Sequence, residues 1–328
     1  MRPLHGAGFA LAISLLSAAV PAAAEPPLLT LPIDCVLGQT CYVEDYVDTD
    51  PGPGQRDYTC GLKSRDDHRG TDIVLLSFEA MEAGVNVLAA VPGTVAATRD
   101  GMEDVAVTDA TRASIEGREC GNAVRIDHGG GWQTLYCHMA RGSIAVETGQ
   151  QVAAGDVLGL VGLSGLTNVP HVHLGVLKDG AIVDPFNPDN RDTCGVDLGE
   201  GLWRDAPDYD RAGLFTAGFS NGVPDFEDVK SGAARLRSAT PDTPLVLYGH
   251  VFYARPGDVM TLTASGPEGA LFAHEVTLED PQAQLFRAYG RRAPQSGWQP
   301  GAYRGYVQLT REGRLIAVRH ADITISPN

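Results

Sequence analysis

Two histidines stand two residues apart in the stretch "NVPHVHLGV", residues 168–176. The run around them is apolar and β-branched, which is typical of a strand, and in a strand residues i and i+2 point to the same face. His171 and His173 are therefore predicted to share one face, with Val172 and Leu174 on the other. Such a pair is either a hydrogen-bonded structural pair or part of a metal or catalytic site. The second interpretation requires partners elsewhere in the chain.

Candidate partners lie upstream in two separate segments. His68 stands four residues before Asp72 in "DDHRGTDIVLL", and His138 ends the strand-like run "TLYCHMA". By alternation along that run, His138 is predicted to share a face with Tyr136 and to lie opposite Cys137. Imidazole nitrogens and carboxylate oxygens are good zinc ligands, and zinc hydrolases typically use three protein ligands and keep a fourth position for water. Four histidines and one aspartate thus predict a zinc hydrolase site.

These motifs resemble the lysostaphin-type (LytM-type) zinc endopeptidases of bacterial cell walls. The resemblance covers residues 65–187 and includes the H-x-x-x-D, a Y-x-H after the "IDHGGGW" hairpin, and the H-x-H, in that order. The framing segments "VLAAVPGTV" and "GQQVAAGDVLGLVGLSGLTNVPHVHLGV" match in position and spacing. The segment "SFEAMEAG" after the aspartate and "LTNVP" before the H-x-H depart from the family pattern, but neither removes a ligand.

The resemblance implies a role for each of the five residues. His68, Asp72 and His173 would bind one Zn²⁺ per chain. His171 would act as general base toward the attacking water, and His138 would stabilise the developing oxyanion and help proton transfer. His128, in the hairpin turn, and the histidines after residue 206 are interpreted as structural.

The resemblance also implies a function and leaves one alternative. The first interpretation is an exported zinc-dependent endopeptidase that hydrolyses peptide bonds in peptidoglycan stem peptides or cross-links. The alternative is a LytM-type protein that does not cut, but activates a cell-wall amidase or scaffolds division proteins. Proteins of that second kind typically lack zinc ligands. All three ligand positions and both assisting histidines are present here, which favours the enzyme.

The element pattern predicts an all-β protein. Short alternating runs broken by glycines indicate antiparallel strands over residues 25–205, with a polar insertion, "RDGMEDVAVTDATRASIEGREC", between two of them. The resemblance implies a LytM-type peptidase domain there, with a duplicated-hybrid-motif-like fold. Residues 206–328 continue as strands separated by turns such as "RPGD" and "REGR", which predicts a β-sandwich accessory domain with a short helix at "FEDVKSGAARLRS".

The N-terminus and the cysteines predict export. Residues 1–24 have the apolar run and the small-residue cleavage site of a signal peptide, and no later stretch is long and apolar enough to span a membrane. The six cysteines all follow that segment, and an even number in an exported protein favours disulfides, with 15 connectivities open. A thiolate zinc site is the rival interpretation, but it lacks a C-x-x-C pair. The periplasm is the preferred location.

The formal net charge of −16 bears on the partners. Nucleic acid is excluded as a partner because its phosphates would be repelled. The expected partners are peptidoglycan peptides as substrate, and a cell-wall amidase or division proteins under the alternative function.

Overall fold

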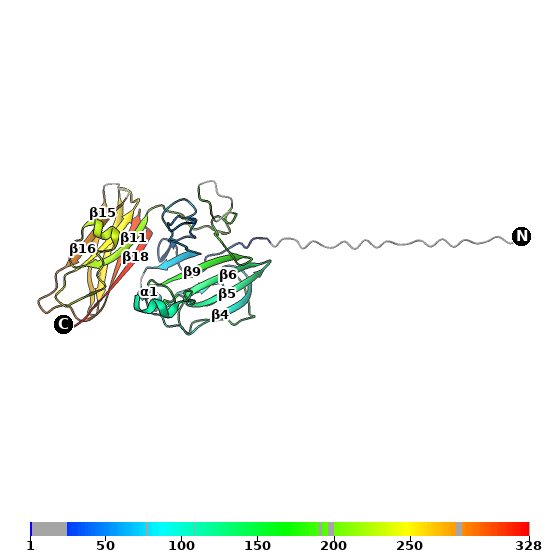
Figure 1. Ribbon diagram of the computed structural model, residues 1–328, viewed down its shortest axis with the longest axis horizontal. Coiled ribbons are helices and arrows are strands. Elements are labelled where there is room, and N and C mark those ends of the chain that lie inside the picture. The colour runs from blue at the N-terminus through cyan, green and yellow to red at the C-terminus, as the bar shows by residue number, and fades with distance from the viewer. Residues whose placement is uncertain are drawn as a thin grey trace.

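A computed structural model describes residue 1 and residues 25–327, apart from residues 77, 108, 190–191, 196–199 and 280–283. The predicted all-β class is confirmed, since antiparallel sheets dominate and the helices are short (Figure 1). The larger sheet has the spatial order β1 (Cys41–Asp45), β2 (Thr71–Leu75), β9 (His171–Lys178), β6 (Trp132–Met139), β5 (Asn122–Gly129), β4 (Gly93–Arg99), β7 (Gln151–Val152), with β10 (Ala181–Val183) beside β9. A separate pair consists of β3 (Asn86–Leu88) and β8 (Val157–Leu160).

The two faces of the larger sheet differ. Val172 and Leu174 of β9 are fully buried in one core together with Ile73 of β2 and Tyr136 of β6. Alternation along the strand then turns the two histidines of β9 to the opposite face. Burial of the apolar side chains therefore determines which face carries the imidazoles, as the sequence predicts.

Cross-strand register brings distant segments to that face. Asp72 of β2 lies directly opposite His173 of β9, and Cys137 of β6 lies opposite His173 on the other side. Paired residues in neighbouring strands share a face and lie close together. Three segments separated by up to about a hundred residues of sequence are thus adjacent on one surface of the sheet.

Residues 213–325, named here the C-terminal β region, form two further sheets. The first has the order β11 (Gly213–Ser220), β13 (Leu245–Phe252), β16 (Gln284–Arg291), and the second β12 (Ser238–Ala239), β18 (Arg314–Ile325), β17 (Gly301–Arg311), β14 (Asp258–Gly266), β15 (Gly269–Leu278). All pairings are antiparallel except β12 with β18. Both sheets contribute to one apolar core, which includes Phe219 and Leu262. The helix α3 (Phe226–Ser231) falls within the predicted helical segment.

The C-terminal β region packs against the edge of the larger sheet. Tyr42 of β1 and Val74 of β2 belong to its apolar core. The Tyr42 hydroxyl donates to the Val318 carbonyl oxygen at 2.5 Å, and the Lys63 ammonium donates to that of Ile316 at 3.2 Å. A domain boundary near residue 206 stays a prediction. These contacts join residues before the boundary to residues after it.

The remaining short helices flank the larger sheet. They are α1 (Phe78–Glu82), α2 (Asp109–Arg112) and the 3₁₀ helix η1 (Ala113–Ile115), the last two lying in the predicted insertion. The insertion is tied to the loop before β9, because the Val107 amide donates to the Thr167 carbonyl oxygen and the Asp104 carboxylate accepts from the Leu163 amide.

All six cysteines form disulfides: Cys35–Cys41, Cys60–Cys194 and Cys120–Cys137. The prediction of disulfides is confirmed, and no thiolate remains for a zinc site. Across the part of the chain that the structure describes, no helix is long and apolar enough to cross a membrane. The predicted signal peptide lies, but for its first residue, outside the described residues.

Candidate functional site

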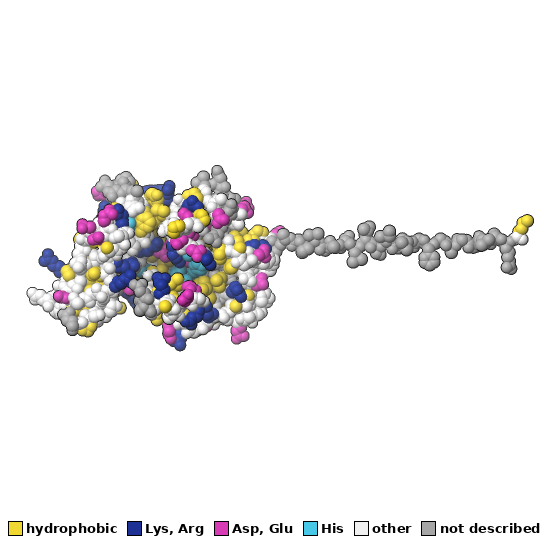
Figure 2. Space-filling view, in the orientation of Figure 1, with side chains coloured by type: hydrophobic (Ala, Val, Ile, Leu, Met, Phe, Trp, Pro, Cys, Tyr) yellow, Lys and Arg dark blue, Asp and Glu magenta, His cyan; other side chains and the backbone are white. Residues whose placement is uncertain are grey.

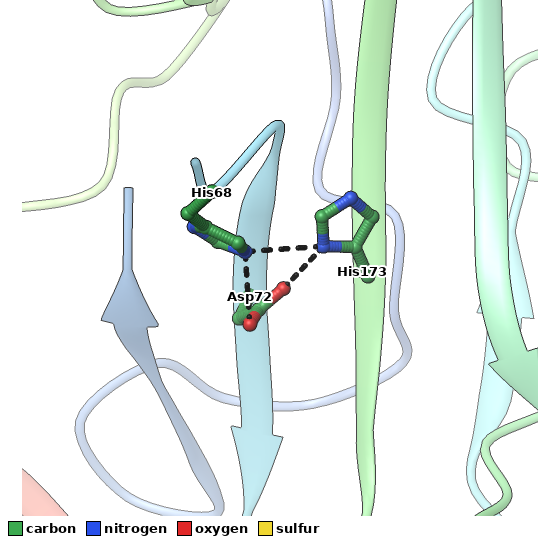
Figure 3. A group of neighbouring side chains, drawn as sticks. All are labelled: His68, Asp72 and His173. Carbon is green, nitrogen blue, oxygen red and sulfur yellow. Dashed lines mark hydrogen bonds and ion pairs between the residues drawn. The ribbon is translucent and has the colours of Figure 1, made fainter. Parts of the chain in front are cut away.

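One cluster of metal-ligating side chains brings together His68, Asp72 and His173 (Figure 3). One ligand atom from each lies within 4.8 Å of the others. His68 Nε2 is 3.1 Å from Asp72 Oδ2 and 3.2 Å from His173 Nδ1, and His173 Nδ1 is 2.6 Å from Asp72 Oδ1. The three side chains predicted as zinc ligands therefore point toward one another.

Local structure orients each member of this cluster. His68 precedes β2, and its Nδ1–H donates to the Tyr46 carbonyl oxygen at 2.7 Å, which turns Nε2 toward Asp72. Gly70 leaves room for the imidazole of His173, since a Cβ there would lie 2.6 Å from His173 Nε2. Any larger residue at position 70 would displace that ring, which explains the glycine between the histidine and the aspartate.

His171 lies buried beside the cluster. Its Nδ1–H donates to the Val169 carbonyl oxygen at 2.9 Å, because a carbonyl oxygen can only accept. The Nε2 atom is buried with no hydrogen-bond partner among the described residues, and it lies 3.6 Å from Asp72 Oδ2. This nitrogen therefore keeps a free lone pair next to the three clustered side chains.

His138 lies on the same face as His171, and the prediction that it would share a face with Tyr136 is wrong. The two imidazole centroids, of His138 and His171, are 4.6 Å apart, whereas Tyr136 is buried in the opposite core. The physical reason is the backbone of His138, whose φ of 61° is left-handed. That conformation breaks the alternation of β6 at its end, and it is uncommon for a residue other than glycine.

The backbone around His138 is held by main-chain contacts and a disulfide. Cys137 is bonded to Cys120, and the Cys120 carbonyl oxygen accepts from the His138 amide at 2.9 Å. The imidazole Nδ1–H of His138 donates to the Ser164 carbonyl oxygen at 2.8 Å. At Gly121 a Cβ would lie only 2.3 Å from that same oxygen. Segments from the insertion, β6 and the loop after β8 thus meet at this histidine.

The protonation of these groups follows from burial and the one carboxylate. Burial lowers the pKa of His171, His173 and, most strongly, His138 below the ordinary value. Burial also acts to lower the pKa of His68, but attraction to Asp72 outweighs it and raises this pKa. Burial raises the pKa of Asp72, yet nearby arginine and imidazoles hold it well below its usual range.

Sequence reasoning missed Arg65 and Asp45. One guanidinium nitrogen of Arg65 donates to Asp72 Oδ2 at 2.7 Å and another to Asp45 Oδ2 at 2.6 Å. Asp45 reaches this position because β1 pairs with β2 opposite Asp72. No local pattern marks Asp45, since its contact with Arg65 depends on the pairing of the irregular N-terminal segment with the sheet.

The donor set fits a divalent metal. Tetrahedral zinc with ligand bonds of about 2.0–2.1 Å separates its ligand atoms by roughly 3.3 Å. The separations of 3.1 and 3.2 Å at His68 Nε2 are close to that value. Two imidazoles and one carboxylate are ligands that zinc takes in catalytic sites, and the buried Nε2 of His171 supplies a nearby acceptor. These residues could hold a metal.

The other histidines that the structure describes lie outside this cluster. His128 bonds the Pro92 carbonyl oxygen and the Thr134 hydroxyl in the hairpin, as expected for a structural residue. His250 pairs with Gln284, and His274 stacks on Tyr289 in the C-terminal β region.

The residues that carry the resemblance to LytM-type endopeptidases thus lie close together in the structure. Residues 66–185 match the family model described as "Peptidase family M23". This match to the M23 family model confirms the resemblance that the motifs indicate.

Two curated relatives match shorter parts of the chain. The cell division protein DipM of Caulobacter vibrioides is 37% identical over 68 residues, 21% of this chain and 11% of that protein. The DD-carboxypeptidase/endopeptidase Mpg of Neisseria meningitidis serogroup B is 39% identical over 67 residues, 20% of this chain and 15% of that protein. The match thus spans only a small part of these relatives' length.

Solved structures of the same kind are similar at a lower level. The catalytic domain of the prophage-encoded M23 protein EnpA from Enterococcus faecalis, in a mutant form, is 23% identical, with a TM-score of 0.32, covering 49% of this chain and 96% of that one. The catalytic domain of lysostaphin from Staphylococcus simulans is 22% identical, with a TM-score of 0.28, covering 41% and 86%. These scores are low, and the family assignment rests on the sequence match.

Proposed function

We propose that this protein is a zinc-dependent endopeptidase that hydrolyses peptide bonds in peptidoglycan stem peptides or cross-links. His68, Asp72 and His173 would be the ligands of one zinc ion, and His171 and His138 the catalytic residues. The observation that carries the proposal is the cluster itself. Three ligand atoms lie within 4.8 Å of one another, next to a buried imidazole nitrogen that has no hydrogen-bond partner among the described residues.

The residues of this chain would divide the chemistry as follows. When bound, a zinc ion supplies Lewis acidity, which acidifies water and polarises a peptide carbonyl. The bond from His171 Nδ1–H to Val169 keeps the lone pair on Nε2, and this atom would accept the proton of the attacking water. Because His171 Nε2 lies 3.6 Å from Asp72 Oδ2, a water bound at the cluster would be within its reach.

His138 would act with the same tautomer. Its Nδ1–H donates to the Ser164 carbonyl oxygen, so the Nε2 atom of the neutral ring is an acceptor. We infer that His138 stabilises an oxyanion only after it has taken up a proton, which it then passes toward the leaving nitrogen. The 4.6 Å separation of the His138 and His171 rings allows both to serve one reacting peptide.

The test is hydrolysis of isolated peptidoglycan by the purified protein, with the released muropeptides identified by mass spectrometry. Matched samples are EDTA-treated protein, the His171→Ala variant, and a His274→Ala control that alters a histidine outside the cluster. We expect metal-dependent release that His171→Ala abolishes and His274→Ala preserves. Full activity of the His171→Ala variant, or activity unaffected by EDTA, would refute the proposed mechanism.

A non-catalytic role as activator of a cell-wall amidase or scaffold of division proteins is the second candidate, because one relative is named a cell division protein. Whether or not zinc binds, this role predicts that the wild type releases no muropeptide. It also predicts that addition of this protein increases the activity of an amidase, and that the His171→Ala variant increases it equally.

We propose that the protein acts outside the cytoplasm, in a bacterial periplasm, with residues 1–24 as its signal peptide. Three disulfides support an oxidising compartment, since such bonds are rare in reduced cytosol. Fractionation of cells producing the full chain, with N-terminal sequencing of the mature protein, tests both statements. Retention of residues 1–24 in a cytoplasmic fraction would contradict them.

A further inference from the structure

A cleft of about 550 Å³ lies between the part of the larger sheet that carries Asp72 and His171 and the C-terminal β region. Asp72, His171 and residues 166–169 line one wall, and residues 214–217 of β11 together with Phe252 of β13 line the other. Figure 2 shows imidazoles at the surface in the middle of the molecule, with charged side chains of both signs around them. The C-terminal β region thus forms part of the surroundings of the proposed active site.

Arginines neutralise the carboxylates of this cleft. Asp72 and Asp45 both accept hydrogen bonds from Arg65. Glu44 forms an ion pair with Arg319 of β18, and Asp45 also lies 3.9 Å from that guanidinium. The acidic side chains that line the cleft are therefore already paired, and they do not oppose the entry of an anionic ligand as free carboxylates would.

Arg235 and Arg112 both line the cleft without a carboxylate partner among the described residues, and of these two Arg235 is the one that hydrogen bonds to β11 hold in place. Its exposed guanidinium donates to the Ala217 carbonyl oxygen at 2.5 Å and lies 3.3 Å from the Thr216 hydroxyl, both neutral groups. These contacts to β11 orient the guanidinium and leave other N–H groups for a ligand.

The neighbouring surface suits an extended peptide. Phe215 and Phe252 line the same wall with ring centroids 4.5 Å apart; Phe252 is buried and supports the half-buried Phe215, which offers apolar surface to the cleft. A guanidinium binds a carboxylate through two parallel N–H···O bonds, which a lysine or a neutral amide cannot reproduce. An anionic group in the cleft would therefore meet a prepared partner beside an apolar wall.

We propose that the C-terminal β region is a wall of the substrate cleft and that Arg235 binds a free carboxylate of the peptide to be cut. This inference rests on the proposed function and adds a substrate class to it: peptides that carry a carboxylate beyond the scissile bond, as peptidoglycan stem peptides do. Arg235 would then determine specificity from outside the M23 domain.

The test measures binding to metal-free protein, so that no turnover occurs. The probes are a cross-linked stem-peptide dimer with free carboxylates and the same dimer with its carboxylates converted to carboxamides, each titrated by calorimetry. We expect the wild type to bind the free acid more tightly than the carboxamide. Arg235→Gln should weaken binding of the free acid about 10- to 100-fold and leave binding of the carboxamide unchanged. Arg235→Lys should restore part of the difference.

The control is Arg287→Gln, which removes a guanidinium that also donates to a main-chain carbonyl but does not line the cleft. It should bind both probes as wild type does, and thermal unfolding of each variant verifies folding. Equal wild-type binding of the two probes, no binding of either, or a preference that survives in Arg235→Gln would each overturn the inference. Peptidoglycan hydrolysis by wild type is scored separately, so a failure of the peptidase function remains distinguishable.

Discussion

Removal of the Cys120–Cys137 disulfide should impair catalysis out of proportion to its effect on stability. This disulfide spans a sequence separation of 17, and the Cys60–Cys194 disulfide spans 134. Loop-closure entropy in the unfolded chain then assigns a loss of about 3 kcal/mol to the first and about 5 kcal/mol to the second. The double variant Cys60→Ala/Cys194→Ala should therefore show a larger fall in melting temperature than Cys120→Ala/Cys137→Ala.

The expected order for activity is the reverse. His138 follows Cys137 directly and has a φ of 61°, a left-handed conformation that costs roughly 1–2 kcal/mol for a residue with a side chain. Without the disulfide the backbone can relax by up to that amount, which would reduce the population of the observed His138 orientation about 5- to 30-fold. We expect kcat to fall by up to this factor in Cys120→Ala/Cys137→Ala, with KM little changed, and kcat to be nearly preserved in the other variant.

The assay is steady-state release of muropeptides well below the melting temperature of either variant. Histidine side-chain nitrogen spectra provide a readout that needs no activity, since loss of the Nδ1–H bond from His138 to Ser164 would mix its two tautomers. The reasoning would be refuted if kcat losses followed the order of the stability losses. An unchanged His138 tautomer in Cys120→Ala/Cys137→Ala would refute it as well.

Three further outcomes follow from the structure. Asp72→Asn should weaken zinc binding by more than about 100-fold in a chelator competition, since it removes the one carboxylate of the cluster. Binding of one zinc ion per chain of this variant at nanomolar free metal would contradict the ligand assignment. Gly121→Ala should lower the free energy of unfolding in urea by about 3 kcal/mol, because its Cβ would lie 2.3 Å from the Ser164 carbonyl oxygen. The control Gly117→Ala, also at positive φ but with nothing within 4 Å of its Cβ, should lower it by about 1 kcal/mol. Equal losses would argue against the close approach at Gly121. Burial lowers the pKa of Lys63 to about 8, from 10.5 in the unfolded chain. Between these two pH values the unfolded chain therefore binds more protons than the folded one. The stability of the wild type should rise with pH in this window relative to Lys63→Met, by at most about 3 kcal/mol. A stability difference between those two proteins that stays constant from pH 7 to pH 10 would show that Lys63 is not buried as a cation.

Local sequence predicts part of this site well. The side-chain period of a strand is two residues, so the H-x-H motif places two imidazoles on one face whatever the rest of the chain does. Val172 between them is fully buried in the core, which leaves the opposite face to His171 and His173. The glycine of "HRGTD" is equally local, because the ring of His173 packs where its Cβ would be. Residue types and short spacings therefore carry the chemistry of the cluster.

The tertiary structure decides the orientation of His138. Alternation along β6 predicts the wrong face, and the left-handed φ that reverses it depends on the segment around Cys120 lying against the strand. Nothing within "TLYCHMA" signals that contact. Backbone conformations outside the common regions persist only where surrounding structure enforces them, so a local pattern cannot reveal this one.

Pairings between distant segments were likewise beyond the sequence. Six cysteines allow 15 connectivities, and only the folded chain brings Cys60 to Cys194. Arg65 contacts Asp45 because the N-terminal segment adds β1 to the sheet. The sequence by itself determined the residue types, the shared face of His171 and His173, and the resemblance to a family. The packing of segments far apart in the chain decided which charges meet, how His138 is turned and what forms the far wall of the cleft. The physical reason is that side-chain period is a local property, whereas loop closure and packing depend on the whole chain.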